Sequence, residues 1–483
     1  MTLARLREWS SRHPLALLLL AGMGLRVVLA YVLLPGEGLA GDLRYYGSWM
    51  LILGDGGPAN FYAATAHHGA SLPPGLPWVL WPLGVAAKLL AGLTGVRPDA
   101  AALLLVKVPA IVADGWLAVL LHRLAGRWSG EKAGLLAAGL FLFVPGTWYE
   151  SALWGQVDSV ASLPALAAIA LLIGGWSEAA VVAVVVAILI KPQFITVAFV
   201  IGVVLLRRHL LVRGSGPRPE LQGRLARFDD RLGGWFTREQ GWGRLVSSAF
   251  AAVAITLVLV VPFDMEVWAP ATLAGIPVVG DLAGLAELAK ATAAFFTPLT
   301  ANAYNPWVLV GPHPLYSDFG HWTFDSIRLI DGIRAFGIGA AILGVALALA
   351  GVRLLHREDR ARILLVSTFL VVAFFILPTR VHERYAYFAL VAAAPLAATS
   401  VAWRAWYVVL GLANIVNLHA VLTFGGTAAM QGLPFADATR DPRWILLVVA
   451  ANTALFGWVT WQVLSARSPA YPSPETRLGG GHP

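Results

Sequence analysis

The sequence has little charge and no cysteine. Only 13% of its 483 residues are charged and 58% are hydrophobic, whereas a soluble protein carries roughly 25% charged residues. The absence of Cys excludes a disulfide framework and Cys-ligated zinc. Together these deficits exclude an ordinary water-soluble enzyme, a disordered chain and a disulfide-stabilised secreted module.

The apolar residues that replace the missing charge occur in long blocks. Many blocks are close to the roughly 20 residues that cross the hydrocarbon core of a bilayer, so we expect an all-α polytopic membrane protein. The predicted segments are 14–34, 77–94, 101–121, 133–149, 157–174, 178–190, 193–206, 245–263, 329–351, 362–378, 386–401, 404–424 and 443–464.

One of these thirteen segments does not fit as a crossing. If all of them crossed, the basic loop at 122–132 would lie on the same side as residues 35–75. Segment 77–94 is rich in proline near its start, and we therefore expect a re-entrant or juxtamembrane helix there. About 12 transmembrane helices remain, with both termini in the cytoplasm.

The distribution of basic residues supports this orientation. The predicted cytoplasmic termini and loops contain 22 of the 35 Lys and Arg residues, as the positive-inside rule requires. Nine Arg lie between residues 207 and 244. We interpret this run as a cytoplasmic loop and expect no nucleic-acid partner. The first span lacks a small-residue cleavage site, so we expect a retained helix and not a signal peptide.

A carboxylate follows the first span directly, in the motif Gly-Asp-Leu-Arg-Tyr-Tyr. Asp42 is followed by Arg44 and Tyr45, and aromatic rings at the level of the lipid headgroups can stack on a sugar. An Asp in this position could accept a proton from an incoming hydroxyl. The alternative is an interfacial Asp that caps the next helix within an ordinary aromatic belt.

A second polar motif, Trp-Gly-Gln-Val-Asp, lies at the predicted outer end of segment 133–149. Gln156 brings a donor and an acceptor to the membrane boundary, which suits hydroxyl recognition, and Trp154 precedes it. Asp158 could equally be the N-cap of the following helix. The motif alone leaves both interpretations open.

Lys191, followed by Pro192 and Gln193, interrupts an otherwise apolar run. A charge within such a run is costly unless it faces a cavity or a partner. Lys191 either provides a counter-charge for an anionic headgroup or extends from a helix end to the membrane surface.

Four charged or titratable residues occur within five positions between two apolar blocks. They are Arg380, His382, Glu383 and Arg384, and we predict that they lie on the outer side, where positive charge is disfavoured. Arg is the preferred fork for phosphate oxygens, and His can add a donor. The pattern therefore favours a functional role over a simple linker.

Two further polar positions are less informative. Asp114 lies within an apolar stretch, and an Asp inside a span suggests function. A simple structural alternative is pairing with Lys107, seven residues earlier. Asn302, in the long outer segment, is consistent either with sugar contact or with a turn.

Taken together, these motifs resemble the GT-C superfamily of membrane glycosyltransferases, which use polyprenyl-phosphate-linked sugars. Their order is similar to that in bacterial relatives of the second GPI-anchor mannosyltransferase, and the resemblance covers residues 14–400. A His-Glu-basic element is also similar to one in the dolichyl-phosphate-glucose-dependent glucosyltransferases. The motifs, in chain order, are Gly41-Asp42, Trp49, Phe61-Tyr62, Pro73-Pro74, Asp114, Trp154 to Asp158, Lys191-Pro192-Gln193, Asn302 to Asn305, and His382 to Tyr385.

The resemblance implies a role for each motif. Asp42 would be the general base of an inverting transfer of a hexose, with mannose the sugar implied, from a polyprenyl-phosphate donor to a glycan, glycolipid or protein acceptor. The resemblance implies no cofactor. Because Asp42 is followed by Leu43 and Arg44 and not by a second acid, we expect no metal. The donor phosphate would be bound by Lys191, Arg380, His382 and Arg384. The sugar and acceptor pocket would contain Arg44, Tyr45, Trp154, Gln156, Asp158, Gln193, Asn302 and Glu383.

The resemblance also implies a division of the chain. Residues 1–263 would form the catalytic transmembrane module, which includes a long first extracytoplasmic loop at 35–100 with juxtamembrane helices. Residues 264–328 would be an extracytoplasmic loop, 329–464 a variable transmembrane module and 465–483 a cytoplasmic tail. The active site would face outward from the cell membrane.

Two other classes of protein remain as alternatives. A transporter or flippase of a lipid-linked or anionic solute would place ionisable residues near the bilayer midplane, and Asp114 and Lys107 are the residues that favour it. A scaffold subunit of an envelope-polysaccharide complex would leave the ordered polar motifs unexplained.

Overall fold

The protein is a helical membrane protein with several spans. The computed structural model describes residues 12–65, 72–330 and 332–465, and within these ranges it contains helices and isolated β-bridges but no strand. Eight of the described helices are long and apolar enough to cross a membrane. The predicted fold class is therefore confirmed. Most of the predicted tail, residues 466–483, lies outside the described residues.

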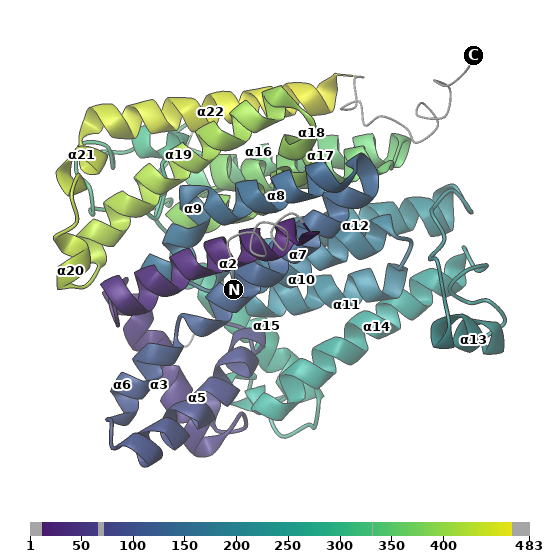
Figure 1. The fold of residues 1–483 in the computed structure, drawn as a ribbon, viewed down its shortest axis with the longest axis horizontal. Helices are drawn as coiled ribbons and strands as arrows, with labels where there is room; N and C mark the ends of the chain where they lie inside the picture. The colour runs from purple at the N-terminus through teal and green to yellow at the C-terminus, as the bar shows by residue number, and fades with distance from the viewer. Residues whose placement is uncertain (1–11, 66–71, 331, 466–483) are drawn as a thin grey trace.

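The long helices run side by side as one bundle (Figure 1). They match the twelve predicted crossings one for one, although several end two to eight residues from the predicted positions. The helices are α2 (Pro14–Val27), α7 (Val108–Ser129), α8 (Glu131–Phe143), α10 (Asp158–Ile173), α11 (Ser177–Ile190), α12 (Ile195–Leu206), α14 (Trp242–Val260), α16 (Ala335–His356), α17 (Arg360–Ile376), α18 (Tyr387–Thr399), α19 (Val401–Gly425) and α22 (Pro442–Leu464).

Helix α18 occupies the centre of this bundle. Nearly every one of its side chains is buried, whereas α14 has few buried residues and lies at the edge in Figure 1. A helix that is apolar on all sides belongs in such a position. The short 3₁₀-helix η8 (Glu383–Ala386) leads directly into α18, so its charged residues lie at one end of the core.

A separate group of helices covers one end of the bundle. It consists of α3 (Ala40–Gly56), α5 (Gly75–Thr94) and α6 (Pro98–Leu105), which lie together beside the long helices in Figure 1. Helices α3 and α5 approach so closely that a Cβ on Gly84 would lie 1.9 Å from the Met50 carbonyl oxygen. The length and composition of α5 suit a span, and the juxtamembrane helix expected here stays a prediction.

The Arg-rich segment lies at the opposite end of the bundle, around α13 (Arg224–Arg231) (Figure 1). Its basic residues form ion pairs with nearby acids. Arg208 Nε lies 2.7 Å from Glu358, and Arg244 Nε lies 2.7 Å from Glu178. These pairs fasten the segment to the ends of neighbouring helices.

A buried ion pair connects α2 to α7 inside the bundle. Arg26 Nε donates to Asp114 Oδ2 over 2.6 Å, and the Tyr387 hydroxyl donates to Asp114 Oδ1 over 2.7 Å. The predicted pairing of Asp114 with Lys107 is therefore wrong. Lys107 precedes the first residue of α7, and its ammonium donates to the carbonyls of Ala152 and Leu153.

Candidate functional site

The Asp42 carboxylate is held by two side chains from the Trp-Gly-Gln motif. Trp154 Nε1 donates to Asp42 Oδ2 over 2.8 Å, and Gln156 Nε2 donates to the same oxygen over 2.7 Å. Asp42 lies in the first turn of α3, but its side chain makes no capping bond. Both donors fix Oδ2, whereas no hydrogen bond from the described residues reaches Oδ1.

The Gln156 amide connects Asp42 to the rest of the site. Its Oε1 accepts hydrogen bonds from the Tyr46 hydroxyl over 2.7 Å and from Lys191 Nζ over 3.2 Å. Tyr46 lies one helical turn after Asp42, so the two side chains share a face of α3. A fully buried amide therefore orients three functional groups at once.

Lys191 and Asp158 form the second part of the site. Lys191 Nζ lies 2.5 Å from Asp158 Oδ2, and Gln193 Nε2 donates to Asp158 Oδ1 over 3.0 Å. Both charged side chains are at least 95% buried. Asp158 is the first residue of α10 but does not cap it, so its role as an N-cap is wrong. The break at Pro192, at the end of α11, places Lys191 against α10.

Arg384 completes the site from the C-terminal half of the chain. Its Nη1 donates to Glu383 Oε1 over 2.9 Å, and its Nε lies 3.8 Å from Asp158 Oδ2. That Nε is buried and has no hydrogen-bond partner among the described residues. The His382 ring packs against Phe296 and Tyr385, with ring centroids 4.9 and 5.4 Å away and tilted planes. The site therefore contains a guanidinium with an unused donor.

The charges of the site influence one another strongly because they are buried. Burial lowers the pKa of Lys191, and burial with the nearby Arg384 lowers the pKa of His382 far below its usual value. Burial raises the pKa of Glu383. Burial also disfavours the charge of Arg384, but Glu383, Asp42 and Asp158 outweigh this and raise its pKa. At neutral pH, His382 is uncharged and Arg384 is a permanent cation.

Two predicted pocket residues lie away from this cluster. Arg44 and Tyr45 are both exposed, and the Arg44 guanidinium lies over the Tyr45 ring at 5.5 Å. Arg44 lies on the other face of α3 from Asp42, as the helical period requires, whereas Tyr45, three residues after Asp42, lies at the exposed side of the face that carries Asp42 and Tyr46. Both side chains therefore lie at the exposed edge of the candidate site.

Arg380 and Asn302 make structural contacts beside the site. Arg380 Nε donates to Asp325 Oδ2 over 2.7 Å, and its guanidinium lies over the Phe336 ring. Asn302 Oδ1 accepts from the Trp322 indole. Its backbone forms a β-bridge with His382. These contacts hold the long outer segment against the residues of η8.

Two residues of the cluster are absent from the predicted site. Tyr46 could have been found from its position one turn after Asp42. Glu150 lies in the one-turn π-helix η2 (Tyr149–Trp154), and its exposed fraction is 1%. The sequence signal for Glu150 was the position of an acid directly after an apolar block. Helix distortions of this kind are frequent at functional sites.

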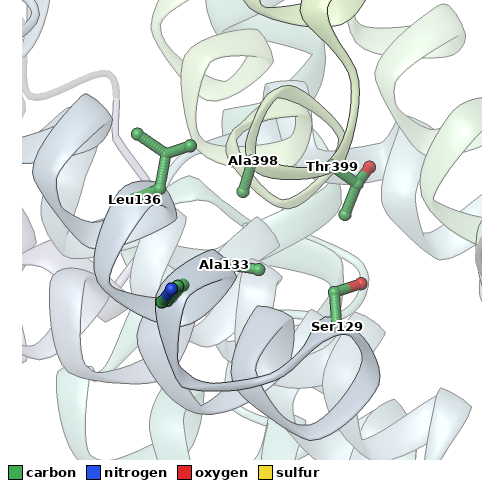
Figure 2. A pocket seen from close by; sticks show the side chains of 6 residues that line it. Ser129, Ala133, Leu136, Ala398 and Thr399 are labelled. Atoms are coloured by element: carbon green, nitrogen blue, oxygen red, sulfur yellow. The ribbon is translucent and has the colours of Figure 1, made fainter. Parts of the chain in front are cut away.

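A pocket elsewhere in the molecule has a different position and character. Figure 2 shows it where the end of α7 meets the end of α18, lined by Ser129, Ala133 and Thr399 among others. It measures about 290 Å³. Because Lys107 and η8 lie at the other ends of these two helices, the pocket is on the far side of the bundle from Asp42.

Comparison with known proteins gives distant structural likenesses only. No protein-family model and no curated protein matches the chain. The oligosaccharyltransferase of Archaeoglobus fulgidus, tethered with an acceptor peptide, is 13% identical with a TM-score of 0.40, and the match covers 96% of this chain and 56% of that one. ArnT from Cupriavidus metallidurans, bound to undecaprenyl phosphate, is 15% identical with a TM-score of 0.42, and the match covers 92% and 77%. The chain thus spans about half the length of the oligosaccharyltransferase, and its function has to be argued from its own site.

Proposed function

We propose that the protein is an inverting glycosyltransferase of the GT-C type, which transfers a hexose from a polyprenyl-phosphate donor to an acceptor hydroxyl. The observation that carries the proposal is the convergence of Asp42, Asp158 with Lys191, and Glu383 with Arg384 from distant parts of the chain. A carboxylate with one free oxygen thus lies close to two buried cations. General-base transfer from a phosphate leaving group needs this combination.

The reaction is a single displacement at the anomeric carbon. Asp42 Oδ1 takes the proton of the acceptor hydroxyl while that oxygen attacks C1 of the sugar. The bond from C1 to the phosphate oxygen breaks, and polyprenyl phosphate leaves with the electron pair. Arg384 Nε, which lacks a partner in the described structure, and Lys191 are the cations that meet the charge developing on the phosphate.

Mannose is the sugar implied by the family resemblance, and the acceptor is a glycan, glycolipid or protein. The site lies at the end of the bundle opposite the Arg-rich segment (Figure 1). By the positive-inside rule, we place the site on the extracytoplasmic face of the cell membrane. A groove between helices would hold the lipid tail of the donor.

The test is replacement of Asp42 by Asn in the purified full-length protein. Transfer from a panel of polyprenyl-phosphate sugars should be abolished, whereas donor-dependent thermal stabilisation should persist because the cations are unchanged. The matched control is Asp55→Asn on the same helix, since Asp55 is exposed and pairs only with Lys88 among the described residues. Unchanged turnover in Asp42→Asn would remove Asp42 from the reaction, and failure of every donor to bind would refute the proposal.

The transporter hypothesis loses the observation that favoured it. Asp114 is fixed by Arg26 and Tyr387, and Lys107 is fixed by two backbone carbonyls. Ionisable residues that carry a solute through a bilayer have to exchange partners. The partners of Asp114 and Lys107 instead connect neighbouring helices and helix ends.

A further inference from the structure

The cations of the site are already occupied before any donor arrives. Lys191 is paired with Asp158, and Arg384 is paired with Glu383. Asp42 is a third carboxylate, and the hydrogen bonds that it accepts from the described residues come from neutral donors, Trp154 and Gln156. A donor phosphodiester adds another negative charge to a buried cluster that has no surplus of positive charge.

Glu150 is a fourth carboxyl group in the same cluster. Its side chain is buried, and no N–H or hydroxyl group of the described residues donates to either carboxyl oxygen. Its carboxyl group lies in hydrogen-bond contact with the Asp158 carboxyl group, which requires a proton between the two. The titratable and charged groups that act on it are Asp158 from α10, Lys191 from the end of α11, Arg384 from η8 and Tyr387 from α18. Of these, Asp158 acts most strongly. An ionised carboxylate that is buried without a partner is costly.

We propose that Glu150 has to hold a proton for the donor phosphate to bind, so that donor binding weakens as the pH rises. The inference rests on the proposed function, because it assumes a phosphate ligand. Burial and the Asp158 carboxylate both raise the pKa of Glu150 well above its ordinary value. Above that pKa, Glu150 loses its proton in the free protein, and phosphate binding has to return it from solvent.

The coupling has a defined sign and size. When one proton is taken up on binding, the dissociation constant rises about tenfold for each pH unit above the pKa of the free site. Below that pKa, no proton is taken up and the affinity is independent of pH. Lys191 also titrates at alkaline pH and would weaken binding in the same direction. A variant is therefore needed to assign the proton.

The experiment measures binding of a synthetic short-chain polyprenyl methyl phosphodiester, whose single negative charge is constant over the range used. Isothermal titration calorimetry of the full-length protein in detergent, from about pH 6 to about pH 10, in two buffers of different ionisation enthalpy, gives both the affinity and the number of protons taken up. Wild type should show the tenfold slope and an uptake that approaches one proton. Wild type alone therefore shows whether a proton is taken up on binding, and a variant then assigns that proton to a residue.

Glu150→Gln, which imitates the protonated side chain, should bind as wild type does at low pH and show a nearly flat profile up to the pH where Lys191 titrates. The matched control is Glu131→Gln, at the other end of the same helical run, where Glu131 is exposed and beside His122. It should keep the wild-type slope. A pH-independent affinity in wild type, or the same slope in Glu150→Gln, would overturn the coupling and leave the proposed function intact. No binding at any pH would overturn both.

Discussion

The indole of Trp154 provides the sharpest test of how Asp42 is oriented. Trp154→Phe keeps most of the ring volume and removes the N–H that donates to Asp42 Oδ2 over 2.8 Å. A hydrogen bond to a charged group contributes about 1.5–3 kcal/mol, and each ~1.4 kcal/mol on a barrier changes a rate tenfold. Because Gln156 still holds the same oxygen, we expect the lower part of that range, roughly a 10- to 30-fold fall in kcat.

The assay is transfer from a polyprenyl-phosphate sugar under saturating donor, with donor affinity measured separately. Affinity should change little, since the phosphate cations are not contacted by the Trp154 indole N–H. Trp148→Phe, the same substitution on α9 (Pro145–Trp148), is the matched control. The reasoning would be refuted by wild-type turnover in Trp154→Phe, or by an equal loss in Trp148→Phe, because a specific bond to Asp42 predicts a difference between them.

Three further outcomes follow from the contacts described above. Arg26→Met leaves Asp114 as an unpaired buried charge, which costs roughly 3–5 kcal/mol, and thermal unfolding should show a clearly lower Tm, partly restored in the double variant with Asp114→Asn. Burial lowers the pKa of His382 in the folded protein, so the unfolded state binds more protons at acidic pH. The contribution of neutral His382 to stability is therefore fully present above the ordinary His pKa of about 6.5 and is lost as the pH decreases below that value. Tm between about pH 5 and 7 should vary less in His382→Gln than in wild type. A chelator such as EDTA should leave transfer unchanged, because the one acid of the Gly-Asp motif is engaged by two N–H donors; restoration of lost activity by a divalent cation would contradict this.

The sequence predicted which side chains gather at the candidate site better than it predicted their arrangement. Asp42, Gln156 and Lys191 stand out in the sequence because a polar side chain at the end of an apolar block is costly without a partner. Their mutual contacts depend on how distant helices pack, and no local pattern encodes that packing. Helices α3 and α5 were likewise predicted only as juxtamembrane helices within a loop, and most of α6 falls in the segment 101–121, which was predicted as a crossing.

Arg380 and Arg384 show where residue type alone is insufficient. Both are Arg in the same short connection, and the sequence predicted one role for them. The backbone of Arg380 is left-handed, with φ of 67°, and its side chain pairs with Asp325. Arg384 lies in η8 and faces Asp158. The two Arg side chains therefore have different partners, and Arg384 is the one that lies beside the Asp158–Lys191 pair.

The partner of Asp114 was missed for a related reason. A spacing of seven residues suggested Lys107, but the Lys107 ammonium donates to the carbonyls of Ala152 and Leu153. Asp114 pairs with Arg26. The signal for the true partner was in the sequence, since Arg26 is itself a charge within the first apolar block.

The position of η8 has a consequence for how the protein is made. Asp42, Glu150 and Asp158 are synthesised long before Arg384, which enters only after α17. A nascent chain that has inserted as far as α12 therefore contains three of the four acids of the cluster but only one of its two cations, Lys191. The predicted N-terminal module 1–263 cannot contain a finished site, and a chain that ends before residue 384 should insert into the membrane yet have no activity.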